Sequence, residues 1–342
     1  MANINEKISK DQFEPAKFDA SKSEQISKPS LNFWQDSWMR VKKNKGAIIS
    51  LVLIAIIAIF ALIGPSLSNF EYDKQNTSHA NLPPRIPALE NVEWLPFDGT
   101  RTLKNGNVVN VYEQKKIEEY YWFGTDGLGR DLFSRVWKGT QISLYIAFLA
   151  AFIDMVIGVA YGSISGYFGG RLDNIMQRII EVLSGIPNLV IVILMILVLK
   201  PGIISITIAL TITGWVSMAR VVRAQVLKMK NQEFVLASRT LGASHAKIIF
   251  KHLIPNLAGV IIINTMFTIP NAIFFEAFLS FIGLGLQEPF ASLGTLIDDG
   301  FRSMRAFPHL MFIPAIVMSV IMIAFNLVAD GLRDALDPKM RD

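Results

Sequence analysis

The sequence predicts an all-α integral membrane protein with six transmembrane helices, and its apolar composition carries that prediction. Hydrophobic residues make up 51% of the 342 residues, and the mean hydropathy is positive. They gather in long runs. The first, Gly46 to Gly64, holds 19 residues without a charge and is long enough to cross a hydrocarbon core of about 30 Å. A soluble domain of this length needs more polar surface.

Composition also excludes several kinds of site. The chain has no cysteine, which excludes disulfides, thiolate catalysis and cysteine-bound metals. Its four histidines are scattered without metal-ligand spacing, so no metal site is expected. The net charge of +5 comes largely from lysines and arginines beside apolar runs, where it indicates orientation in a lipid membrane rather than binding to nucleic acid.

Two polar segments precede the first apolar run. Residues 1–30 have no apolar period, which predicts a disordered cytoplasmic tail. Residues 31–45 place aromatic and aliphatic side chains at helical spacing and end in four cations, which predicts an interfacial helix on the cytoplasmic leaflet; a short soluble helix is the alternative. The cations orient the first span, residues 46–64, from inside to outside. It starts too late for a typical cleavable signal peptide.

Residues 65–138 are expected to form a small external subdomain. Asn105 and Gly106 supply the positive φ angles of a type I′ turn, which predicts a β-hairpin. The segment contains the glycine-rich block Phe123 to Arg135. A phosphate-binding loop is disfavoured there, because the block follows no strand and lacks the P-loop lysine.

The second span, Ile142 to Gly166, carries a stripe of small residues. Glycines 158, 162 and 166 recur every four residues, so they stay near one face of the helix and allow another helix to approach closely. Asp154 belongs to the same stripe, and an intramembrane carboxylate is costly against lipid. We expect Asp154 to face protein or water, either lining a pathway or forming a hydrogen bond in a helix contact.

Four more spans follow, and they place both ends of the chain in the cytoplasm. An ion pair of Arg178 with Glu181 is expected at the start of the third span. A fifth span should be kinked or broken at Pro270, and a re-entrant segment should precede the last span. The third span ends at Leu199 after passing Pro187, and the others are Ile203 to Ala219, Asn256 to Gly285 and Leu310 to Val328.

The fifth span also carries a polar stripe. Asn264, Thr268 and Asn271 recur at helical spacing, and Glu276 lies further toward the outside. Polar side chains inside a membrane face the bundle interior or water. We therefore predict that these four residues and Asp154 line a translocation pathway.

The loop between the fourth and fifth spans, residues 220–256, is strongly basic. It holds seven lysines or arginines and one acid, Glu233, a bias typical of a cytoplasmic loop. Glu233 to Thr240 should form a short helix that Gly242 ends in the left-handed conformation. A second helical segment, His245 to Leu253, should stop at Pro255. So ordered a loop favours a docking surface, with a solvated basic helix pair as the alternative.

The loop reads Glu-Phe-Val-Leu-Ala-Ser-Arg-Thr-Leu-Gly-Ala-Ser from Glu233, and continues to Pro255-Asn256. This resembles the EAA loop of bacterial ABC importer permeases, and in detail the dipeptide and oligopeptide permease family. The family's motif glutamate and second alanine are replaced by Leu236 and Ser238. The block from Phe123 and the segment from Phe275 to Gly285 resemble the same family. The resemblance assigns ATPase coupling to Glu233, Ala237, Ser238, Gly242, Ile248 and Pro255.

The resemblance implies a non-catalytic subunit that forms half of the pathway of a peptide importer in the bacterial plasma membrane. Residues 139–330 would be the permease core and residues 331–342 a cytoplasmic C-terminus. The implied partners are a homologous permease, two ATP-binding subunits that hold ATP and Mg, and an extracellular solute-binding protein. The chain has no P-loop sequence of its own. The family handles dipeptides, longer peptides, nickel chelates and glutathione, and the sequence leaves this choice open.

Two other functions are compatible with a membrane protein of this size. A self-energised carrier or channel could use Asp154, Glu181 and Glu276 as a proton relay, but it leaves the basic loop unexplained. An intramembrane hydrolase is disfavoured by the missing cysteine and by the scattered histidines.

Overall fold

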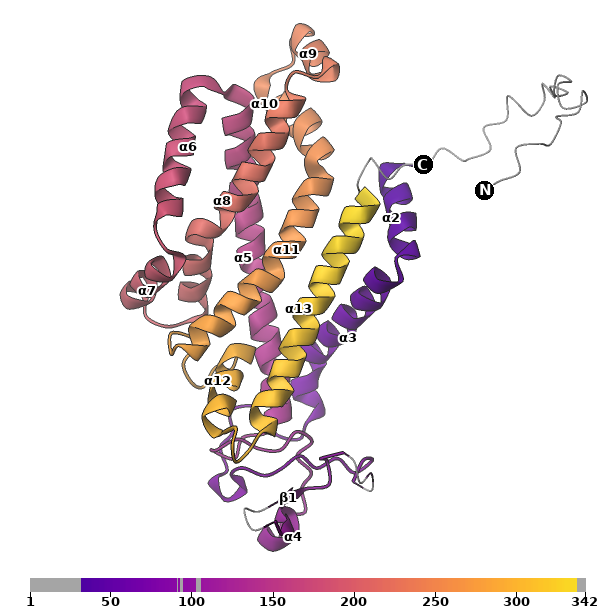
Figure 1. Cartoon of the computed structure of the whole chain (residues 1–342), viewed down its shortest axis with the longest axis vertical. Helices are drawn as coiled ribbons and strands as arrows, with labels where there is room; N and C mark the ends of the chain where they lie inside the picture. The colour runs from indigo at the N-terminus through magenta and orange to yellow at the C-terminus, as the bar shows by residue number, and fades with distance from the viewer. Residues whose placement is uncertain (1–31, 91, 93–94, 103–105, 337–342) are drawn as a thin grey trace, which may run out of the picture.

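Long helices make up most of the computed structural model, which describes residues 32–90, 92, 95–102 and 106–336. Figure 1 shows them side by side, with helix α9 at one end of the bundle and the segment carrying β1 and α4 at the other. The expected tail, residues 1–30, and residues 337–342 lie outside the described residues. Within the described residues, five helices are long and apolar enough to cross a membrane: α3 (Lys45–Leu67), α5 (Leu132–Phe168), α8 (Ile203–Met229), His245–Phe281 and α13 (His309–Leu336).

The expected third span is not straight. Its residues form two helices, α6 (Gly170–Gly185) and α7 (Asn188–Leu199), which meet at 81°. Pro187 disfavours helical backbone at the residue before it, and Ile186 is accordingly extended, with φ −92° and ψ 126°. The prediction of one continuous helix through Pro187 was wrong; with the bent pair counted as one span, the helices give six.

Helix α5 is the centre of the bundle and is longer than the predicted second span. It begins after Asp131, whose side chain accepts a hydrogen bond from the backbone N–H of Ser134 at 3.0 Å. It ends at Gly169, which has a φ of +66°. The cap lies well before the apolar run that defined the predicted span, because the first turns of α5 mix apolar residues with the charged Arg135 and Lys138.

The glycine stripe of α5 packs on α8 as the sequence predicted. A Cβ atom at Gly158 would lie 2.6 Å from the Cβ of Met218, and one at Gly162 would collide with the carbonyl oxygen of Ala219. These contacts leave no room for any side chain at either glycine. The missing side chains allow the two helices to pack backbone to backbone.

The two helices that flank the basic loop run further into it than predicted. Helix α8 continues beyond Ala219 to Met229. On the other side, α10 (His245–Lys247), the π-helical segment η3 (Ile248–Leu253) and α11 (Ile254–Phe281) join into one helix of 37 residues. Pro255 does not stop this helix, and Pro270 does not break it.

The π-helical turn explains why Pro255 is tolerated. A proline inside a helix lacks an N–H donor, and its ring crowds the carbonyl of the preceding turn. The wider η3 segment ends at Leu253, two residues before Pro255, and gives the ring space. The side-chain amide of Asn256 donates to the carbonyl oxygen of His252 at 2.6 Å, which satisfies one acceptor there.

The segment between α3 and α5 has little regular structure. Strand β1 (Thr100–Thr102) pairs antiparallel with β2 (Val108–Asn110), which confirms the predicted hairpin. Asn105 of the predicted turn lies outside the described residues, and Gly106 has a φ of +83°. Two short helices, η2 (Thr77–His79) and α4 (Val111–Lys115), complete the segment. Its small core is Leu82, Val111, Tyr112, Ile117 and Tyr121.

Two amphipathic helices pack against the long helices of the bundle. Helix α2 (Phe33–Lys43) lies in the predicted interfacial segment and packs against the end of α13. Its side chains Trp34 and Trp38 are about half exposed, as a headgroup contact requires. Helix α12 (Leu293–Ser303) lies in the segment predicted to be re-entrant and packs between α11 and α13.

Candidate functional sites: a polar cavity and a basic loop

A cavity of about 210 Å³ lies between α5, α7, α8 and α11. Its walls are apolar, with polar side chains from every one of these helices. The polar lining residues are Asp154, Asn188, Thr213, Ser217, Asn264, Thr268 and Asn271. Four of the five predicted pathway residues are therefore brought together: Asp154, Asn264, Thr268 and Asn271.

Asp154 is the unusual member of this lining. Its side chain is 5% exposed, and its Oδ1 atom is buried without a hydrogen-bond partner. Opposite it on α8 stands Gly214, where any Cβ atom would collide with the carboxylate. The glycine makes room for the carboxylate but offers it no side-chain donor.

The other polar groups are mostly satisfied. Asn264 donates its amide to the carbonyl oxygen of Val260 at 2.8 Å, and Thr268 donates to the carbonyl oxygen of Asn264 at 3.0 Å. Thr213 donates to the Oδ1 atom of Asn188 at 2.9 Å, a bond that joins α8 to α7. These bonds hold Asn188, Thr213, Asn264 and Thr268 in place, whereas no donor reaches the buried Oδ1 atom of Asp154.

Glu276 lies outside the cavity. Its side chain is fully buried and accepts hydrogen bonds from Ser143 at 3.0 Å and Ser280 at 2.9 Å. Ser143 also accepts a bond from the backbone N–H of Leu293, so this cluster ties α5 and α11 to the start of α12. On α11, the residue that follows Asn264, Thr268 and Asn271 along the cavity face is Phe275. Glu276 is the next residue in the chain, so its side chain points about 100° away from that face.

In the basic loop, α9 (Glu233–Thr240) has the predicted bounds, and Gly242 has the predicted left-handed backbone, with a φ of +79°. Of the residues assigned to coupling, Glu233, Ala237, Gly242 and Pro255 are exposed, Ser238 is partly buried and Ile248 is fully buried. Apolar side chains on this loop also remain exposed: Phe234, Leu236, Leu241 and Phe250.

The loop is firmly attached to the membrane helices. Val235 of α9 packs in one core with Ile248 and Leu253 and with residues of α8, among them Met218, which also lines the cavity. At the end of α5, the Tyr167 hydroxyl lies 2.9 Å from the Nδ1 atom of His245. Lys230 donates to the carbonyl oxygen of Gly166 at 2.8 Å.

A second attachment joins α6 to α8. Both carboxylate oxygens of Asp173 accept hydrogen bonds from the guanidinium of Arg223 at 2.6 Å. Arg178 and Glu181 form the predicted ion pair, also at 2.6 Å, but both side chains are more than half exposed. The bidentate pair is buried enough to hold α6 in place, whereas the exposed pair contributes little to stability.

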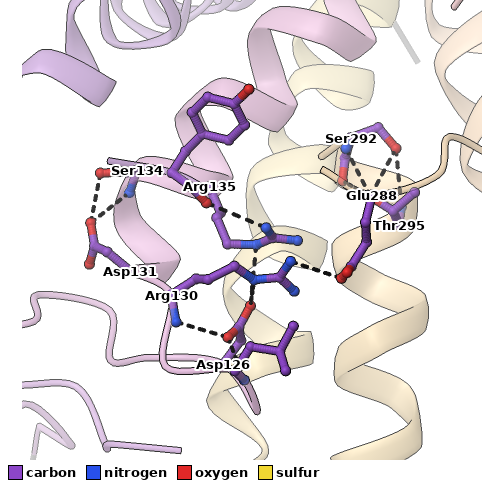
Figure 2. Close-up of polar contacts among 10 residues, drawn as sticks. Asp126, Arg130, Asp131, Ser134, Arg135, Glu288, Ser292 and Thr295 are labelled. Atoms are coloured by element: carbon purple, nitrogen blue, oxygen red, sulfur yellow. Dashed lines mark hydrogen bonds and ion pairs between the residues drawn. The ribbon is translucent and has the colours of Figure 1, made fainter. Parts of the chain in front are cut away.

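At the opposite end of the bundle the glycine-rich block forms a cluster of buried charges (Figure 2). Arg130 reaches two carboxylates, Asp126 at 2.6 Å and Glu288 at 2.8 Å. The Nε atom of Arg135 lies 3.4 Å from the same Asp126 oxygen without a hydrogen bond. Burial raises the pKa of the nearby Asp299 carboxyl, against the charges of both arginines, which lower it. The cluster joins the start of α5 to the segment before α12.

Residues 158–342 match the family described as "Binding-protein-dependent transport system inner membrane component". The chain belongs to this family. Residues 32–84 also match the "N-terminal TM domain of oligopeptide transport permease C". The family confirms the predictions of a membrane transport subunit and of a chain that is not an enzyme and needs no cofactor of its own. It also places this permease in the inner membrane, as a multi-pass component that depends on a binding protein and an ATPase.

Several curated permeases are similar along almost their whole length. The permease is 44% identical to the oligopeptide transport system permease protein OppC of Bacillus subtilis, over 98% of this chain and 99% of that protein. It is 46% identical to the dipeptide transport system permease protein DppC of the same organism, over 93% and 90%. A solved chain of the MetNI methionine ABC transporter is similar over 58% of this chain and 95% of that chain, with 18% identity and a TM-score of 0.49.

The sequence did not point to several residues of these sites. Asn188 is the single polar lining residue from α7, and Thr213 and Ser217 are only a pair, four positions apart on α8, which is too short to stand out as a stripe. Asp173 and Arg223 lie 50 positions apart, so no local spacing relates them. The buried charges of the glycine-rich block were visible as a motif, but their partner Glu288 lies far along the chain.

Proposed function

We propose that this permease forms half of the translocation pathway of an ATP-driven importer of peptides in the bacterial plasma membrane. The observation that carries the proposal is the identity of 44% and 46% to an oligopeptide and a dipeptide permease over nearly the full length. The polar cavity supports it, because a peptide needs hydrogen-bonding groups along an otherwise apolar route.

A homologous permease subunit would complete the pathway. Asn271 lines the cavity yet is exposed in the single chain, and the partly buried Thr268 lies one turn before it on the same helix. Polar side chains facing lipid are costly, so this face needs a protein partner or water beside it. A second permease packed there would turn a half-open cavity into a closed passage.

One of the two ATP-binding subunits of the complex would dock on the basic loop, and these subunits would hold ATP and Mg. Exposed Phe234, Leu241 and Phe250 give the loop an apolar surface that suits a protein partner. The helix His245–Phe281 begins in the loop and is about 55 Å long by its rise per residue, so it reaches the cavity at Asn264 and Thr268. A movement of the loop would therefore shift the cavity wall directly.

The test is peptide uptake into proteoliposomes that hold the full complex, with the solute-binding protein supplied outside. We expect uptake that needs ATP and both permeases. Equal uptake by permeases reconstituted without the ATP-binding subunits would instead identify a self-energised carrier and contradict the proposal.

Gly242→Val is expected to uncouple ATP hydrolysis from transport. A β-branched residue at φ +79° is strained by roughly 1–2 kcal/mol or more, which would re-aim the turn between α9 and the helix from His245. Space is not the obstacle, because no atom lies within 4 Å of a Cβ atom built there. We expect Gly242→Val to insert normally into the membrane, while uptake and substrate-stimulated ATPase activity of the reconstituted complex fall together. Gly242→Ala should reduce both activities less.

Gly106 provides a matched control. It has a φ of +83° and the same open space around a Cβ atom, but it lies in the external hairpin. Gly106→Val therefore introduces the same strain away from the loop and should keep ATPase stimulation. Wild-type uptake and stimulation in Gly242→Val would show that the loop is not the coupling element.

The proposed orientation places both termini and the basic loop in the cytoplasm. Helix α2 packs beside the end of α13, and Figure 1 shows both at the α9 end of the bundle. Since the chain has no cysteine, single cysteines can be labelled without background. Exposed Val108→Cys should react with an impermeant maleimide on intact cells, and exposed Arg171→Cys only after permeabilisation. The reverse pattern would invert the topology.

A further inference from the structure

The polar cavity contains a buried carboxyl group, Asp154, that has no ion-pair partner in the described part of the chain. Asp154 forms no ion pair with any described residue, and its Oδ1 atom has no donor. The first two cations after Gly214 on α8 are engaged elsewhere: Arg220 donates to Ser184 at 2.9 Å, and Arg223 binds Asp173. An isolated buried carboxylate is costly, so a cation that enters the cavity would be bound strongly there.

Several groups that line the cavity with Asp154 can accept a hydrogen bond. The amide nitrogen of Asn264 is engaged with Val260, which leaves its Oδ1 atom free to accept. Thr268 likewise donates its hydroxyl proton to its own helix. Asn271 and Ser217 complete the lining with side chains that can accept as well as donate. A primary ammonium has three donors and no acceptor, so it complements this set.

We propose that Asp154 binds the ammonium group of the transported solute, which for a peptide is its α-amino group. The inference rests on the proposed function. It adds which residue of the permease, Asp154, meets which chemical group of the transported solute, the ammonium, inside the membrane. The carboxylate would supply a charge-assisted hydrogen bond, which is stronger than a bond between neutral groups.

A purely structural role for Asp154 does not fit the contacts. A carboxylate that stabilises a helix pair would accept a hydrogen bond from the neighbouring helix, as Glu276 does from Ser143. Asp154 instead faces Gly214 and the cavity. A cation from the homologous subunit is the competing partner, and the experiment below distinguishes it.

The test measures peptide binding to the complete membrane complex of both permeases and both ATP-binding subunits in nanodiscs, without the solute-binding protein. The probes are radiolabelled trialanine and N-acetyl-trialanine, which differ in the ammonium group. We expect the wild type to bind trialanine about tenfold more tightly or better, the value of a hydrogen bond to a charged group. Asp154→Asn should abolish this preference, and Asp154→Glu should retain part of it.

Glu276→Gln is the matched control, because it removes another buried carboxylate that lies outside the cavity and keeps an acceptor for Ser143. It should keep the preference. Equal binding of both peptides by the wild type, or a preference that survives in Asp154→Asn, would overturn the proposal. Loss of the homologous subunit from purified Asp154→Asn, but not from purified Asp154→Glu, would assign the carboxylate to a subunit contact and would also overturn the proposal.

Failure of the inference and failure of the proposed function remain distinct. ATP-driven peptide uptake by the full complex establishes the function whether or not the ammonium is recognised. If uptake is present and the preference is absent, only the role of Asp154 is contradicted. If peptides are neither bound nor taken up, the peptide function itself fails.

Discussion

Replacing Gly162 by leucine is expected to prevent the folded permease from accumulating. A Cβ atom at this position would collide with the carbonyl oxygen of Ala219 and lie 2.9 Å from the Cβ of Val222 and 3.0 Å from the backbone nitrogen of Arg223. Two of these atoms belong to the backbone and cannot rotate away. Leucine would therefore force α5 and α8 apart, at a cost of about 3 kcal/mol or more.

The measurement is the yield and the melting temperature of the purified permease complex in detergent. Gly185→Leu is the control, since Gly185 is also helical but has no atom within 4 Å of the place that a Cβ atom would take. We expect near-normal yield for Gly185→Leu and little folded material for Gly162→Leu. Equal stability of the two variants would mean that α5 and α8 are not held in contact by the glycines.

The sequence predicted the features that depend on local spacing. The glycines at 158, 162 and 166 recur every four residues, so the close face of α5 was visible without a structure. The helix from Glu233 and its left-handed end at Gly242 follow from a helical apolar period and a single glycine. Such features need no knowledge of the partner element.

Helix ends were predicted less well, because hydropathy locates the apolar run rather than the helix. Helix α5 starts at its cap, Asp131, and α8 continues past Ala219 through a basic stretch. Pro255 lacks a donor, but a π-helical turn before it accommodates the ring. Whether a proline ends a helix thus depends on the neighbouring turn, which apolar spacing does not describe.

The cavity was partly predictable for a related reason. Asn264, Thr268 and Asn271 share one helix face, so their stripe indicated a common environment. Glu276 was grouped with them because it is polar and lies on the same helix, yet it points toward Ser143. Residues contributed singly, such as Asn188, can be assigned only when the packing of several helices is known.

The buried charge cluster at the opposite end gives a second large expected effect: Asp126→Ala should destabilise the permease by about 3–5 kcal/mol. The Asp126 carboxylate faces both Arg130 and Arg135, whose side chains are 4% and 1% exposed. Removing the carboxylate would leave the positive charges of two buried guanidinium groups incompletely neutralised. The resulting loss of stability is far larger than the net stabilisation that the intact ion pair provides. Glu288 would still pair with Arg130 but forms no ion pair with Arg135 among the described residues.

Asp126→Asn separates the charge of this residue from its role in the turn. The Oδ1 atom of Asp126 accepts hydrogen bonds from the backbone N–H groups of Leu128 at 2.9 Å and Arg130 at 3.0 Å. Asparagine keeps an acceptor for these bonds and loses the negative charge. A loss in Asp126→Asn close to that in Asp126→Ala would assign most of the effect to charge.

Glu181→Ala is the matched control for burial. The Arg178–Glu181 pair has the same 2.6 Å separation as the Arg130–Asp126 pair, but its side chains are 82% and 56% exposed. Solvent screens it, so its loss should cost under about 1 kcal/mol. The melting temperatures of the purified variants give the comparison. The two pairs have equal distances and differ in burial. A similar small loss of stability in both variants would therefore show that the cluster of Asp126, Arg130 and Arg135 is hydrated. The cluster would then not hold the start of α5 to the segment before α12.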